Sequence, residues 1–114
     1  MASLVEVEEI VGPIVVKPWD PRLIRGRSVM LINTGGTIGM KLNALGSLES
    51  CPGFLAERLA EMHELQRPDV PALVLYEVLP MIDSSNMGPR EWVRIAELIE
   101  AHYFEHDAFV VISK

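Results

Sequence analysis

The chain has 114 residues, of which 49% are apolar and 23% charged, so it can form one domain with its own core and is too apolar for a disordered segment. The net charge of -6 argues against nucleic acid and anionic membranes as main partners, because both require a basic face. No apolar run approaches the length of a membrane span, and residues 1–9 do not form a secretory signal.

The cysteine and histidine residues indicate a reducing compartment and do not predict a metal-binding site. Cys51 has no partner for an internal disulfide, which fits a cytoplasmic setting. A catalytic thiol is the less favoured interpretation of Cys51, and an incidental loop thiol is the favoured one. His63, His102 and His106 offer no pair with metal-ligand spacing on one helix face, so we expect no metal site. No P-loop lysine or dinucleotide fingerprint is present, and we expect no cofactor.

Residues 1–27 are the least regular part of the chain. The Val and Ile residues between positions 4 and 16 predict a hairpin or an added edge strand, and the prolines at 18 and 21 predict a turn or linker. We therefore divide the chain into an N-terminal extension, residues 1–27, and a domain, residues 28–114.

From residue 28 onward, predicted strands alternate with predicted helices. Apolar runs at 28–33, 72–79 and 108–113 predict buried strands. The order strand, helix, strand, helix, strand is typical of an α/β fold with right-handed crossovers. We expect a three-layer, doubly wound parallel sheet with helices on its faces.

The two helices are predicted from apolar spacing and capping residues. We expect a long loop at 41–50, then a helix with Ser50 as N-cap and Pro52 in its first turn. Its apolar positions are Leu55, Leu59 and Met62. The second helix is expected to begin at Pro89, and its apolar stripe comprises Trp92, Ile95, Ala96, Ile99 and Tyr103.

A glycine-rich stretch, Thr34-Gly35-Gly36-Thr37-Ile38-Gly39-Met40, follows the first predicted strand. Adjacent glycines let the backbone turn sharply and present N–H groups to a ligand, and ligands of open α/β sheets bind at the carboxyl ends of strands. The hydroxyl of Thr37 is a candidate nucleophile at such an end, provided that a base activates it. From the residue types alone, a tight turn with an incidental threonine is the favoured interpretation.

A second polar loop, Asp83-Ser84-Ser85-Asn86, follows the next predicted strand and is expected at the same sheet edge. The two loops together offer backbone amides, hydroxyls and a carboxylate, which suit both charged ends of an amino acid. Helix capping explains the second loop about as well, because Asp, Ser and Asn are common in capping turns.

These two loops in this order, followed by a helix with Trp92 and by the strand Phe109-Val110-Val111-Ile112, resemble the N-terminal part of bacterial-type L-asparaginases. The similarity is greatest to the cytosolic type I branch and covers residues 28–112. It implies hydrolysis of L-asparagine to L-aspartate and ammonia without a cofactor. It also implies that intact relatives are homo-oligomers.

The resemblance assigns roles to four residues of the two loops. Thr37 is implied as the catalytic nucleophile that attacks the side-chain amide and forms an acyl-enzyme. Asp83, Ser84 and Ser85 are implied as substrate-binding residues that hold the amino-acid part. Fixing both ends of the substrate places its amide carbonyl over the nucleophile.

Three features depart from the family pattern. Residues 44–50 contain no tyrosine where the family has one that helps to activate the threonine, and Ser47 stands near that place. Asn86 replaces an aspartate. The chain ends at Ser113-Lys114, where the family's second motif, His-Gly-Thr-Asp-Thr, is expected to begin. We therefore expect the chain to be truncated before the second catalytic motif and inactive alone.

Two other functions remain open. One is a non-catalytic remnant that binds an amino acid or a full-length partner. The other, given less weight, is a flavodoxin-like ligand-binding domain unrelated to asparaginases.

Overall fold

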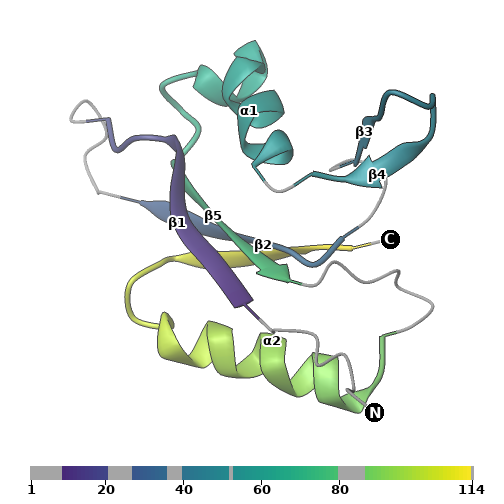
Figure 1. The fold of residues 1–114 in the computed structure, drawn as a ribbon. Coiled ribbons are helices and arrows are strands. Elements are labelled where there is room, and N and C mark those ends of the chain that lie inside the picture. Colours follow the sequence, from purple (N-terminus) through teal and green to yellow (C-terminus); the bar gives the residue numbers. More distant parts are fainter. Residues whose placement is uncertain (1–8, 21–26, 36–39, 52, 80–86, 114) are drawn as a thin grey trace.

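The computed structural model describes residues 9–20, 27–35, 40–51, 53–79 and 87–113, with a sheet between two helical layers (Figure 1). No helix in these ranges is long and apolar enough to cross a bilayer. The elements in chain order are β1 (Glu9–Lys17), β2 (Ser28–Asn33), β3 (Met40–Leu42), β4 (Leu48–Ser50), α1 (Phe54–Glu61), the short 3-10 helix η2 (His63–Gln66), β5 (Ala72–Leu79), α2 (Pro89–Ala101) and β6 (Ala108–Ile112).

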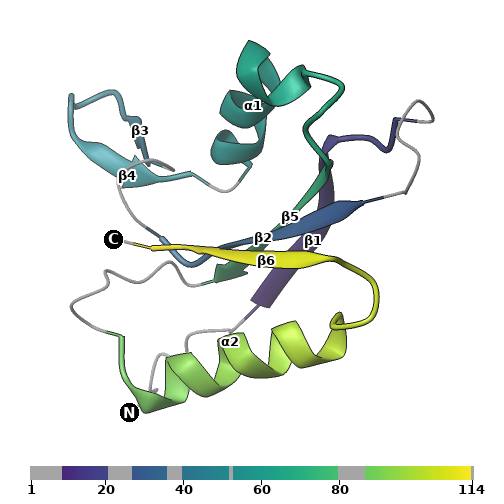
Figure 2. The same cartoon turned by 180° about the vertical axis from the view of Figure 1, so that it is seen from behind.

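The central sheet has the strand order β1-β5-β2-β6. β2 pairs in parallel with both β5 and β6, which confirms the predicted parallel arrangement of these strands. β1 pairs antiparallel with β5, so the predicted N-terminal extension supplies an edge strand and the sheet is mixed. The chain moves from β2 to β5 and then back past β2 to β6, and α1 and α2 consequently cover opposite faces (Figure 2).

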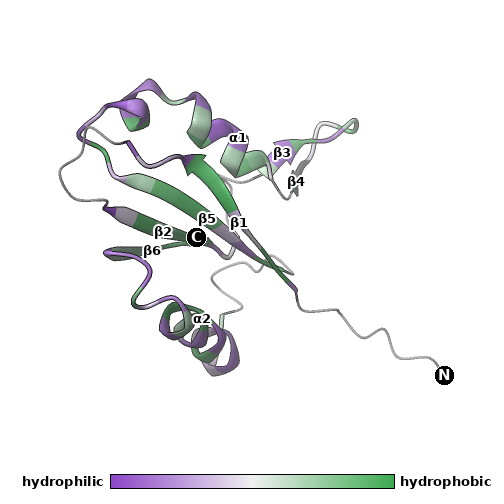
Figure 3. Cartoon of the chain, turned by 90° about the vertical axis from the view of Figure 1, so that its left-hand side faces the viewer, coloured by the Kyte–Doolittle hydropathy of each residue, from purple (hydrophilic) through white to green (hydrophobic). Residues whose placement is uncertain are grey.

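Alternation of side chains along the strands divides the core into two clusters. Leu31, Leu73 and Leu75 face α1 and pack with Leu55 and Leu59. The cluster on the other face, against α2, consists of Met30, Ile32, Tyr76, Val78, Ile95 and Leu98. Figure 3 shows the result, a largely apolar sheet between helices of mixed character.

Lys17, the last residue of β1, ties this edge strand to the chain that precedes β5. Its side chain is buried, and the ammonium donates hydrogen bonds to the carbonyl oxygens of Arg67 and Val70, the latter at 2.5 Å. A buried charge requires such partners, because an unpaired ammonium in the core is costly. The contact therefore holds the segment before β5 against the end of β1.

The segment between β2 and α1 differs from the sequence-based prediction. Instead of a long loop at 41–50, β3 and β4 form an antiparallel hairpin. The side chain of Asn43 stabilises its turn by accepting hydrogen bonds from the backbone N–H groups of Leu45 and Ser47 at 2.9 and 3.0 Å. Strands of three residues carry too little periodicity to be recognised in a sequence.

The start of α1 also differs from the prediction. The N-cap is Gly53, whose φ of 86° lies in the left-handed region, and Ser50 ends β4 instead. Leu55 and Leu59 are buried as expected. Met62 is the C-cap of the helix and is 40% exposed.

Helix α2 begins at Pro89 as predicted, but its buried face is rotated from the predicted stripe. Ile95 and Leu98 are buried, whereas Trp92 and Tyr103 are 52% and 59% exposed. Both faces have helical spacing and share Ile95, so periodicity alone does not distinguish them.

We expect that Leu55→Ala destabilises the fold by about 2–5 kcal/mol, because it removes a fully buried side chain from the cluster under α1. The measurement is the free energy of unfolding in urea. Leu45→Ala is the control, since Leu45 is 91% exposed and its loss should change that free energy by less than about 0.5 kcal/mol. Equal effects of the two variants would contradict this assignment of the core.

We also expect the 114-residue chain to self-associate through β6. Within the described residues, β6 pairs with β2 alone, and its Val110 and Val111 are 46% and 37% exposed. An apolar edge strand of this kind is a template for pairing. Val110→Lys should increase the monomer fraction in size-exclusion chromatography, and Leu45→Lys should not. A monomeric unmodified chain would refute the expectation.

Candidate functional site

The carboxyl ends of β2, β5 and β6 lie at one edge of the sheet (Figure 1). Asn33, the last residue of β2, stands opposite Glu77 of β5 and Ile112 of β6. Ligands of open α/β sheets bind at this kind of edge. The two loops with predicted functional residues follow β2 and β5.

The predicted site residues themselves, Thr37, Asp83, Ser84 and Ser85, lie outside the described residues. The same holds for Asn86. That they share a site therefore stays a prediction. It is supported by the strands that precede them, which are parallel neighbours and end at the same edge.

A buried polar network stands at this edge. Glu77 is 0% exposed, and its Oε1 accepts a hydrogen bond from the N–H of Gly53 at 2.6 Å. Its Oε2 accepts a longer one, 3.4 Å, from Nδ2 of Asn33. The side-chain oxygen of Asn33 accepts the N–H of Gly35 at 3.1 Å. Because a buried carboxylate is costly without donors, these contacts join β5 to the end of β2 and to the start of α1.

Thr34 fixes the first part of the glycine-rich stretch. Its backbone N–H and its hydroxyl both donate to the carbonyl oxygen of Ile112, each at 2.9 Å. Gly35 follows with a φ of 139°, a conformation that favours glycine. Hydrogen bonds to β6 and to Asn33 therefore fix the backbone of Thr34 and Gly35, directly after β2.

The roles of Asn33 and Glu77 at this edge were not predicted from the sequence. A signal was present, because Glu77 is a charged residue within the otherwise apolar strand 72–79. Side-chain alternation places it on the same face as Leu73 and Leu75, toward α1. Its partner Gly53 is distant in sequence, so no local pattern indicates the contact.

Glu91 organises the start of α2, where the chain returns from the second loop. Its Oε2 accepts the N–H of Gly88 at 2.9 Å. Hydrogen bonds from its own backbone N–H and from that of Gly88 lower the pKa of its carboxyl. A carboxylate at this position is also favoured by the positive end of the helix dipole.

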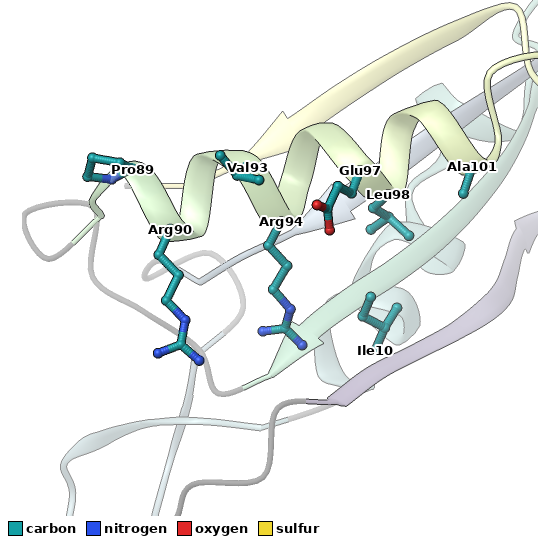
Figure 4. Close-up of a pocket in the computed structure, with 8 residues that line it drawn as sticks. All are labelled: Ile10, Pro89, Arg90, Val93, Arg94, Glu97, Leu98 and Ala101. Carbon is teal, nitrogen blue, oxygen red and sulfur yellow. The ribbon is translucent and has the colours of Figure 1, made fainter.

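A hollow of about 710 Å³ lies between α2 and β1 (Figure 4). Ile10 of β1 and Val93 and Leu98 of α2 supply apolar lining, and Arg90 and Arg94 extend from the helix beside it. Arg94 donates to the carbonyl oxygen of Leu79 at 3.0 Å. The described residues that line the hollow belong to β1 and α2, and none of them was predicted as a site residue.

Two of the three histidines lie close together in space, which the sequence pattern did not indicate. His102 and His106 lie near each other in the turn after α2, and with Glu105 they place three ligand-capable atoms within 4.8 Å of one another. The sequence-based expectation concerned spacing along one helix face, and it does not cover this pair, because α2 ends at Ala101, before both residues. His63 lies in η2, and Cys51 is a half-buried free thiol.

Comparisons with known proteins agree with the architecture. The family model described as "Asparaginase, N-terminal" matches residues 28–113. L-asparaginase 1 of Escherichia coli (strain K12) is 42% identical over 86 residues, which are 75% of this chain and 25% of that protein. The 60 kDa lysophospholipase of Mus musculus is 36% identical over 105 residues. This match covers 75% of this chain and 19% of that protein. This chain thus spans a quarter or less of each relative's length.

The crystal structure of L-asparaginase I from Vibrio cholerae matches with a TM-score of 0.65 and 38% sequence identity. The match covers 76% of this chain and 25% of that one. It confirms the predicted α/β fold class. β1 lies before the residues that the family model matches and adds to the same sheet.

We expect Glu77→Gln to lower the free energy of unfolding by about 1–3 kcal/mol. The carboxylate accepts hydrogen bonds from two donors, and the NH₂ group of glutamine would have to face one of them. Urea unfolding measures the effect. Glu64→Gln, an exposed change in η2, is the matched control and should cost less than about 0.5 kcal/mol. A neutral Glu77→Gln would show that the network does not support this edge.

Proposed function

The chain belongs to the asparaginase family through its N-terminal domain, and from this premise we propose that it is the amino-terminal part of an amidohydrolase that acts on L-asparagine with Thr37 as nucleophile. One observation carries the proposal. The family match spans both loops, and the strands before them, β2 and β5, are parallel neighbours that end at one sheet edge.

In the proposed reaction, the hydroxyl oxygen of Thr37 attacks the side-chain amide carbon of asparagine as its proton passes to a base. The leaving nitrogen takes up a proton and departs as ammonia, which leaves an ester between Thr37 and the aspartyl group. Water then hydrolyses this ester, releases aspartate and restores the hydroxyl. Backbone amides of the glycine-rich stretch stabilise the oxyanion.

Asp83, Ser84 and Ser85 hold the amino-acid part of the substrate in this proposal. Hydroxyls and amides bind the α-carboxylate, and a carboxylate binds the ammonium. The buried contacts of Glu77 and of Thr34 support the role of this edge, because they fix the backbone from which the glycine-rich stretch departs. A rigid support of this kind aids orientation of the amide over the nucleophile.

We propose further that the 114-residue chain does not hydrolyse asparagine alone. The family's second catalytic threonine, its aspartate and the later lysine are not within these residues, and no tyrosine occurs at 44–50 to help to activate Thr37. An amino-acid-binding or partner-binding role without turnover is the alternative function. A cytoplasmic location and a homo-oligomeric holoprotein belong to the proposal as well.

The proposal is tested with a chimera in which residues 28–113 replace the matching part of E. coli L-asparaginase 1. We expect ammonia release from asparagine, with a higher rate when Ser47→Tyr and Asn86→Asp restore the family residues. Thr37→Ala should lower turnover by about 10⁴-fold or more. Thr37→Ser, which keeps a hydroxyl, is the matched control and should retain activity.

Near-normal ammonia release from Thr37→Ala would exclude Thr37 as the nucleophile. The 114-residue chain is assayed in parallel, and a turnover of about 1 per second or faster would disprove its dependence on further residues. Aspartate binding without turnover in every variant would favour the binding role. Release of fatty acid from a lysophospholipid in place of ammonia from asparagine would overturn the substrate assignment.

A further inference from the structure

The turn between α2 and β6 gathers three side chains that are common metal ligands. His102 is the C-cap of α2, and Glu105 and His106 follow within the same turn. Each offers one ligand atom, and the three atoms lie within 4.8 Å of one another. Both histidines are partly buried and the glutamate is exposed, so the group opens to solvent on one side.

Neighbouring residues hold the two imidazoles in place. The hydroxyl of Ser28 lies 2.9 Å from Nδ1 of His106, and the backbone N–H of Ser28 donates to Asp107 at 2.8 Å. The ring of Tyr76 lies 4.9 Å from that of His102, centre to centre. Partners of this kind orient histidine ligands in metal sites.

We propose that His102, Glu105 and His106 form a binding site for a zinc-class divalent cation. Two imidazole nitrogens and one carboxylate oxygen make a ligand set that zinc accepts, with water in the fourth position. Magnesium and calcium prefer sites made of oxygen ligands and fit this set poorly.

To hold the ion, the three ligand atoms, which now lie within 4.8 Å of one another, must move to the spacing of a tetrahedral site. Bonds of about 2.1 Å in a tetrahedral site place ligand atoms about 3.4 Å apart. His102 and Glu105 now form a hydrogen bond of 2.5 Å. When an ion binds, this hydrogen bond breaks, and both atoms bond to the ion instead. The Glu105 side chain is 61% exposed and can rotate to make that change without disturbing the core.

The site lies at the amino ends of β2 and β6. The N–H of Asp107 donates to the carbonyl oxygen of Ser28, the first residue of β2, at 2.9 Å. The predicted functional loops follow the carboxyl ends of β2 and β5, at the opposite edge of the sheet. A bound ion would therefore stabilise the α2–β6 turn, and through it the folded chain, without occupying the edge assigned to the amide substrate.

The experiment titrates Zn²⁺ into the untagged 114-residue chain at micromolar concentration, in competition with a chromophoric chelator. We expect one Zn²⁺ per chain, a rise in the thermal midpoint with Zn²⁺, and no such response to Mg²⁺. Co²⁺ in place of Zn²⁺ should give the visible absorption of a tetrahedral site. Glu105→Gln and His106→Gln should each lower Zn²⁺ affinity by about tenfold or more, and Ser28→Ala by a similar or smaller factor.

His63→Gln and Cys51→Ser are the matched controls, because each removes a metal-binding side chain elsewhere and should leave Zn²⁺ affinity unchanged. Far-ultraviolet circular dichroism records whether a histidine variant alters the fold. Glu105 is exposed, so Glu105→Gln should leave the fold intact and tests the site in either case. Absence of saturable Zn²⁺ binding would overturn the proposal. Binding that Glu105→Gln and His106→Gln leave intact, or that His63→Gln or Cys51→Ser abolishes, would overturn it as well.

Discussion

A carboxylate within an apolar sheet must find hydrogen-bond donors in its own surroundings, and at Glu77 these donors come from two other parts of the chain. One oxygen accepts a hydrogen bond from the backbone N–H of Gly53, and the other accepts one from the side-chain amide of Asn33. The start of α1, the end of β2 and the carboxyl-terminal part of β5 are thereby joined at a single group. The glycine-rich stretch begins where these contacts end, so its departure from the sheet depends on them.

The strands and the fold class follow from local patterns, and the contacts of the site do not. Apolar runs predict β2, β5 and β6 nearly to the residue, and Pro89 marks the start of α2. The choice among neighbouring faces of a helix depends on tertiary packing, which is why Trp92 was assigned to the core and Leu98 was not. The partners of Glu77 and the approach of His102 to Tyr76 join distant parts of the sequence, so no window of the chain predicts them.

β2 connects the two functional regions that we assign. Its first residue, Ser28, holds the turn that carries His106, and its last, Asn33, takes part in the network of Glu77. With about 3.3 Å per residue, the two ends of the strand are about 17 Å apart. An ion bound beside Ser28 is therefore too far away to contact the groups at the other end of the strand.

The long connection between β1 and its partner has a consequence for the order in which the chain folds. Lys17 is in register with Leu73, and its ammonium binds the carbonyl oxygens of Arg67 and Val70, so the edge strand requires a partner about fifty positions further along the chain. Closing so large a loop costs more chain entropy than forming a local helix or hairpin. We therefore expect β1 to pair with β5 only after residues 72–79 have been synthesised.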